Sequence, residues 1–244
     1  MNSYNIFARY YDLLTENVDY DAGFNFISGF LNEIGAKTVI DLACGTGKMS
    51  EKLINNGYSL TCIDASDEML SLAENRLFNA GGKYVLINAK MQDFALCEPQ
   101  DACICCLDSI NHLTDKKDVL KAFENVYASL NNFGVFIFDV NTVYKHKTAL
   151  NNQTYVFDED DFYLVWDNEV LGNERVRIIL DFFIENENGL YERYSEEFEE
   201  RAYSEELLTE MLEKAGFREI DIYGDFNKSR PTNTDERFYF VCRK

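Results

Sequence analysis

Apolar residues follow two alternating periodicities over the first 140 residues of the chain. From Tyr20 to Ile34 they recur with helical spacing, which predicts a helix that ends at Gly35. Helical spacing also predicts helices over residues 48–56, 67–77 and 115–130, with Ser66 and Thr114 as the N-caps of the last two. Short apolar runs between these helices predict strands. The five expected strands cover residues 38–42, 60–63, 84–88, 102–107 and 135–140.

The pattern changes in the second half of the chain. Residues 155–201 show short alternating segments without a helical signal, and Asn188-Gly189 between two of them indicates a hairpin. We therefore expect three or four antiparallel strands here. A helix is predicted over residues 205–215, capped by Ser204 and ended by Gly216, and two final strands are predicted over residues 217–223 and 238–242 as an edge hairpin.

Strands that alternate with helices predict a parallel sheet covered on both faces, because parallel strands need crossover connections. The expected fold is α/β: a doubly wound, mostly parallel seven-stranded sheet with an inserted small antiparallel β-sheet. Residues 1–143 and 204–244 would form the main, Rossmann-like domain. Residues 144–203 would form the insert.

The charge of the chain narrows the classes of partner. Its 43 acidic residues outweigh 23 basic ones, which gives a formal charge of −20. Such a field repels phosphate backbones, so nucleic acid and anionic membranes are not expected, and a small neutral or cationic ligand fits better. The alternative is that the charge only keeps the protein soluble. We expect no membrane span and, since the first residues do not look like a secretory signal, a cytoplasmic protein.

The chain has seven cysteines, an odd number, and several of them lie in apolar segments. Reduced, buried thiols explain this best. Cys103, Cys105 and Cys106 have no zinc-site spacing, and we expect no metal.

A glycine-rich turn joins the first strand of the main domain to its next helix, at Asp41 to Gly47. Gly45 and Gly47 let a ligand approach the backbone, and the free N–H groups of the helix could hold a carboxylate or a phosphate. A P-loop is excluded by Leu42 and Met49, which stand where that motif needs Gly and Ser or Thr. A dinucleotide site remains open, although Ser50 occupies the third glycine position of its motif.

Four segments together resemble the class I S-adenosylmethionine-dependent methyltransferases. They are VIDLACGTG (39–47), CIDASDEML (62–70), AKMQDF (89–94) and DACICCLDSINHL (101–113). The resemblance covers about residues 1–143 and 204–244. It implies S-adenosyl-L-methionine as the methyl donor, S-adenosyl-L-homocysteine as the product, and in-line transfer to a small-molecule acceptor.

The resemblance also implies roles for individual residues. Asp64 would bind the ribose hydroxyls and Asp93 the adenine amino group. Asp41 would orient the loop or meet the donor's ammonium group, and Tyr10 or Tyr11 would help close the pocket. The predicted donor-binding set is Tyr11, Asp41, Ala43, Cys44, Gly45, Gly47, Asp64, Ala65, Met69, Met91, Gln92, Asp93 and Leu107.

The acceptor side is less defined by the sequence. His112 and Asp108 follow the fourth strand, where open α/β sheets bind ligands, and are the candidate catalytic residues. For His112 the alternative is a loop residue that packs ahead of the next helix. Candidate substrate contacts are Ser109, Asn111 and, from the insert, Trp166; the aromatic residues of the insert could line a cavity or form its own core.

The sequence does not identify the acceptor, its nucleophilic atom or the oligomeric state. Two other functions stay open: an NAD(P)-dependent oxidoreductase, and a non-catalytic regulatory protein that binds an adenosyl ligand.

Overall fold

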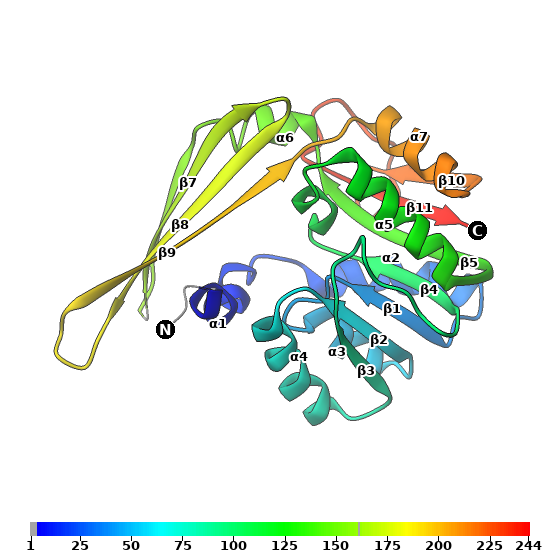
Figure 1. Ribbon diagram of the computed structural model, residues 1–244, viewed down its shortest axis with the longest axis horizontal. Helices are drawn as coiled ribbons and strands as arrows, with labels where there is room; N and C mark the ends of the chain where they lie inside the picture. The colour runs from blue at the N-terminus through cyan, green and yellow to red at the C-terminus, as the bar shows by residue number, and fades with distance from the viewer. Residues whose placement is uncertain (1–3, 161) are drawn as a thin grey trace.

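The computed structural model describes residues 4–160 and 162–244, which form two separate sheets (Figure 1). The larger sheet has seven strands in the order β10-β11-β5-β4-β1-β2-β3. Its first five strands in the chain pair in parallel, and β11 pairs antiparallel with both β5 and β10. The predicted mostly parallel seven-stranded sheet is confirmed. Its strands are β1 (Thr38–Leu42), β2 (Ser59–Asp64), β3 (Tyr84–Asn88), β4 (Gln100–Cys105), β5 (Leu130–Asn141), β10 (Glu219–Tyr223) and β11 (Arg237–Arg243).

Helices cover both faces of this sheet, as the alternating pattern predicts. On one face, α5 (Lys116–Ser129) and α7 (Glu205–Ala215) bury apolar side chains against β4, β5 and β11. On the other face, α2 (Tyr20–Glu33), α3 (Lys48–Asn55) and α4 (Asp67–Ala80) pack in a second cluster. Both clusters consist of buried apolar side chains, so burial of apolar area is what holds the layers together.

The insert forms the smaller sheet, with four antiparallel strands in the order β6-β7-β8-β9. It extends away from the larger sheet and returns along β9 toward the C-terminal elements (Figure 1). The hairpin between β7 and β8 was not predicted; Asn173 and Glu174 turn it with φ of 53° and 56°, and Gly172 directly before them also has a positive φ, of 82°. The strands are β6 (Thr154–Asp158), β7 (Tyr163–Gly172), β8 (Arg175–Glu185) and β9 (Tyr191–Arg201).

Two short helices and one cap differ from the sequence expectation. The chain begins with α1 (Tyr4–Leu14) and enters the insert through α6 (Val143–Lys147), neither of which was predicted; α6 has only five residues, and no glycine ends α1. The N-cap of α5 is Asp115, whose side chain accepts from the Lys117 N–H, so the prediction of Thr114 was wrong by one position.

Helix α1 links the two sheets. Its Tyr10 ring lies 4.7 Å from Phe162 and 5.8 Å from Phe182 in the core of the insert. Its other end contacts α4 and the loop after β1 (Figure 1). None of the helices in the described part of the chain is long and apolar enough to cross a membrane.

Candidate active site

The loop after β1 has the backbone shape that its glycines indicate. Ala43, Gly45 and Gly47 all adopt left-handed φ, of 57°, 54° and 79°. A Cβ on Gly47 would lie 3.2 Å from the Cβ of Ala73 in α4, so only glycine fits there. A Cβ on Gly45 would meet the Tyr11 ring at 3.8 Å, so that ring stands over the loop.

Asp64 closes this loop from the end of β2. Its Oδ2 accepts from the Gly45 N–H at 2.8 Å, and its Oδ1 accepts from the Ser66 N–H at 2.9 Å. Burial raises the pKa of the carboxyl above its usual value. Each carboxylate oxygen has a second lone pair, so Asp64 can still accept from a ligand hydroxyl. This arrangement ties the glycine loop to the residue that is predicted to bind ribose.

The acidic residue of β1 lies beneath the loop rather than at its surface. Asp41 is 2 % exposed and accepts a hydrogen bond from the Ser50 hydroxyl. Burial raises the pKa of Asp41 to about 7. Of the two roles left open for Asp41, this contact matches the orienting one, because Ser50 belongs to the first turn of α3 and so joins the strand to the helix.

The other predicted donor residues surround the ends of β2 and β3. Ser66 caps α4 by accepting from the Met69 N–H at 3.1 Å, and Ala65 precedes it in an exposed position. Met91 and Gln92 are half-buried in the turn after β3, where Asp93 is exposed. Cys44 is half-buried within the glycine loop. All of these residues follow the carboxyl ends of β1, β2 and β3, as the topology requires.

The exit of β4 is held by two residues that the sequence did not indicate. Asp139 of β5 accepts from the N–H groups of Leu107 at 2.8 Å and Asp108 at 2.9 Å. Arg237 of β11 donates to Asp139 and, at 2.5 Å, to Asp108. These contacts stabilise Leu107 and Asp108 in left-handed conformations, with φ of 57° and 51°.

Arg237 also sets the charge of Asp108. Burial opposes ionisation of this carboxyl, but the adjacent guanidinium outweighs burial and lowers its pKa. A carboxylate whose pKa is lowered is a poor proton acceptor. Of the two candidate bases, Asp108 is therefore the weaker one.

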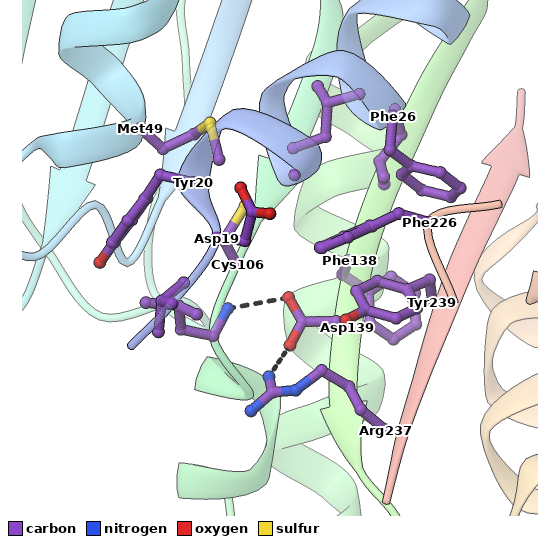
Figure 2. Close-up of a pocket in the computed structure, with 15 residues that line it drawn as sticks. Asp19, Tyr20, Phe26, Met49, Cys106, Phe138, Asp139, Phe226, Arg237 and Tyr239 are labelled. Carbon is purple, nitrogen blue, oxygen red and sulfur yellow. Dashed lines mark hydrogen bonds and ion pairs between the residues drawn. The ribbon is translucent and has the colours of Figure 1, made fainter. Parts of the chain in front are cut away.

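A cavity of about 210 Å³ adjoins this exit (Figure 2). Leu107, Asp139 and Arg237 form its polar side, and Figure 2 shows Tyr20, Met49 and Phe226 on its apolar side. Since Leu107 belongs to the predicted donor set, the cavity continues the donor site toward α2 and β11.

Helix α1 covers the loop through another group that the sequence did not indicate. Asp12 accepts from the Thr46 hydroxyl at 2.6 Å and from the guanidinium of Arg76 in α4, and Lys48 donates to its backbone oxygen at 2.8 Å. Burial raises the pKa of the neighbouring Tyr11 hydroxyl, and nearby Tyr20, Asp108 and Asp64 add to the rise. Tyr11 therefore lies between the glycine loop and the exit of β4.

The candidate acceptor residues divide into two groups. His112 has a 43 % exposed side chain, with its ring 5.0 Å from Phe198 and its Nε2 3.9 Å from Glu200 Oε1. The Ser109 hydroxyl donates to the Cys106 carbonyl at 2.8 Å and is half-buried near the same exit. These two side chains stand near the predicted donor site.

Asn111 and Trp166 are committed to the fold instead. Asn111 is fully buried, and its amide makes three hydrogen bonds to the backbone of Asn141 and Arg201. Trp166 donates to Asn168 at 3.0 Å and is a half-buried side chain that packs against the apolar core of the insert. As substrate contacts these two residues are disfavoured, because their polar atoms already have partners.

Comparison with known proteins identifies the class. Residues 39–134 match the model of a family described as a methyltransferase domain. A Bacillus subtilis protein named as a methyltransferase, YqeM, is 32 % identical over 99 % of this chain and 97 % of its own length. The glycine/sarcosine N-methyltransferase of Aphanothece halophytica is 27 % identical, over 88 % of this chain and 78 % of its own.

A solved structure agrees over the whole chain. The S-adenosylmethionine-dependent methyltransferase of Clostridium acetobutylicum is 33 % identical, covers 99 % of both chains and superposes with a TM-score of 0.89. These matches favour a methyltransferase over the oxidoreductase alternative. The glycine loop, the carboxylate at the end of β2 and the strand order thus belong to one scheme, and the chain is a member of the class I S-adenosylmethionine-dependent methyltransferases.

Proposed function

We propose that this protein transfers a methyl group in-line from S-adenosyl-L-methionine to a small-molecule acceptor, and that the reaction takes place between the loop after β1 and the exit of β4. The observation that carries the proposal is the bond from the Gly45 N–H to Asp64, which builds a ligand cradle from the backbone and a carboxylate. The named activities of the relatives support a small acceptor.

The residues present fit the donor. A hydrogen-bonding carboxylate at the end of β2 suits a ribose, and the glycine loop leaves room for a ligand because a Cβ at Gly45 would meet only Tyr11 within 4 Å. The predicted donor-binding set would hold S-adenosyl-L-methionine, with Asp64 on the ribose, Asp93 on the adenine and Leu107 at the methionine end. Bound there, it supplies a methyl group already activated on a sulfonium.

The chain then mainly has to position the acceptor. Holding two reactants in line can lower a barrier by roughly 7–11 kcal/mol in well-oriented cases. His112 can accept a proton where the acceptor arrives protonated, and Tyr11 with α1 can exclude water from the donor. In this proposal residues 1–143 and 204–244 are the donor domain, and residues 144–203 are an acceptor subdomain.

Two measurements test the proposal. Calorimetry with S-adenosylhomocysteine and NAD should show binding of the first alone. A screen of small amines, hydroxy compounds and thiols should then reveal acceptor-dependent formation of S-adenosylhomocysteine. Donor binding without turnover on any acceptor would favour the non-catalytic regulatory alternative, and tight binding of NAD alone would contradict the proposal.

A further inference from the structure

A cluster of metal-ligating side chains lies beside the exit of β4. Asp108, His112 and Glu200 each offer one ligand atom, and these atoms all lie within 4.8 Å of one another. The first two follow β4, while Glu200 is near the end of β9 in the insert. We propose that this cluster binds one divalent ion of a first-row transition metal, such as Zn²⁺ or Mn²⁺. Binding of the ion is independent of the proposed function, whereas the role given to the ion below rests on it.

Glu200 is the centre of the cluster. It is 4 % exposed, its Oε1 faces the His112 Nε2 at 3.9 Å, and its Oε2 faces the His146 Nε2 at 3.6 Å. Asn141 donates to Oε2 at 3.4 Å. A buried carboxylate is stable only when it is neutralised or paired with a cation. Two imidazoles and one amide compensate it incompletely, and a divalent ion would complete it.

His146 supplies a second, independent observation. It is 5 % exposed, and neither of its ring nitrogens has a hydrogen-bond partner among the residues described. Leaving such a group buried and unsatisfied costs about 1–3 kcal/mol. Its position beside Oε2 of Glu200 is that of a side chain that orients a metal ligand. A bound ion would draw Glu200 and His146 together and satisfy both.

The chemistry of the donor atoms selects the ion. Imidazole nitrogen with carboxylate oxygens suits Zn²⁺ and Mn²⁺ better than Ca²⁺ or Mg²⁺, which prefer oxygen alone. Ligand bonds of about 2.0–2.2 Å require the three groups to approach slightly. Arg237 occupies one oxygen of Asp108 and leaves the other for the ion. Asp108 is therefore the weakest of the three ligands.

The location indicates what the ion would do. His112 is the exposed side of the cluster, so water or an acceptor can reach the ion there. With its Nε2 bound to the ion, His112 would be a ligand and would no longer act as the proton acceptor. Asp108 directly follows Leu107 of the predicted donor set. An ion at this place would hold an acceptor's oxygen or nitrogen atom beside the donor.

To test the proposal, untagged, metal-stripped protein is titrated with Co²⁺, a spectroscopic substitute for Zn²⁺. Binding is measured by calorimetry and by visible absorption. One equivalent should bind, without the sulfur-to-cobalt absorption that the cysteines would cause. Glu200→Gln, and separately His112→Ala at the exposed ligand, should weaken binding at least 30-fold, and His146→Asn about 10-fold. Glu199→Gln is the matched control. Glu199 precedes Glu200 in β9, so its side chain points to the opposite face of the sheet, where it pairs with Arg175 and Arg177.

Equal Co²⁺ affinity in the wild-type protein and the Glu200→Gln and His112→Ala variants would overturn the proposal, as would a sulfur-to-cobalt absorption in the wild type. Affinity for S-adenosylhomocysteine is measured on the same metal-free samples. It should be unchanged in every variant that folds, so the loss of the metal site and the failure of the donor site are separate results.

Discussion

The seven-stranded sheet and the four-stranded insert place their functional side chains in opposite ways. In the sheet, most of the predicted donor residues lie in or near a loop that directly follows a strand, as Gly45 follows β1 and Asp93 follows β3, while Tyr11 comes from α1 and Asp41 from β1 itself. In the insert, Glu200 is part of a strand and reaches the site only because β9 returns to β4. Most of the predicted donor residues therefore lie in short segments of the sequence, whereas the residues proposed for the acceptor side come from distant ones.

The two regions also hold strained residues in different places. Ala43, Leu107 and Asp108 have left-handed φ at the carboxyl ends of β1 and β4, next to the predicted ligand. The left-handed Asn173 and Glu174 of the insert lie in a hairpin. Such strain costs about 1–3 kcal/mol per residue and persists where the surroundings determine the backbone. In the sheet, the left-handed residues shape the loops around the predicted donor site. In the insert, Asn173 and Glu174 only form the turn of a hairpin.

The largest effect is expected from Asp41→Asn in the sheet. Because burial raises the pKa of Asp41 from 3.8 to about 7, its stabilising contribution is complete below about pH 4 and is lost as the pH rises through 7. The loss amounts to at most about 4 kcal/mol. The variant has no charge to bury, so it should unfold at higher urea than the wild type at pH 8, with the difference vanishing toward pH 4. The exposed Asp93→Asn is the control, and identical pH profiles for wild type and Asp41→Asn would refute the assignment.

Tyr10→Ala should separate the insert from the sheet. Tyr10 is 4 % exposed and joins α1 to Phe162 and Phe182, so its loss should cost about 3 kcal/mol of unfolding free energy. Hydrogen exchange should quicken in α1 and in β7 and β8, and much less in β1 and β2. Tyr10→Phe keeps the ring and should behave like the wild type. An equal rise in both sheets would show that they unfold as one unit.

Asp64→Ala tests the donor half alone. Affinity for S-adenosylhomocysteine, measured by calorimetry, should fall about 100-fold, because a charged acceptor is lost from the ribose and the Gly45 N–H loses its partner. Asp67→Asn, an exposed position in the first turn of α4, should keep the wild-type affinity. Unchanged affinity in Asp64→Ala would remove the ribose assignment.

The smallest effects compare the strain in the two regions directly. Ala43→Gly and Glu174→Gly each put a residue without a Cβ at a left-handed position and should raise the free energy of unfolding by about 0.5–1 kcal/mol. Denaturant curves of the single variants measure this. If Ala43→Gly lowers stability while Glu174→Gly raises it, the methyl group of Ala43 contributes packing that outweighs its strain.

Sequence patterns predicted the elements whose signals are local. Periodicity and turn chemistry predicted the parallel strands, the caps Ser66 and Ser204, and an insert of three or four antiparallel strands. The hairpin at Asn173 was missed because its two turn residues are not a typical Asn-Gly pair, and Gly172 lies one position before them. Helix α1 is as long as α7 but was missed because no glycine ends it, as Gly216 ends α7. Thr114 was chosen as a cap one position early because Asp115 is an equally good capping residue.

The sequence by itself determined the alternation of strands and helices along the main domain, the glycine loop and the presence of a carboxylate at the end of β2, because each depends on residues within one turn or one strand of each other. Only the tertiary structure brought Asp139 and Arg237, 98 residues apart, to the exit of β4, Asp12 to Arg76, and Glu200 to His112. Their partners are chosen by how the sheets pack, and no local periodicity records a contact between segments that meet only after folding.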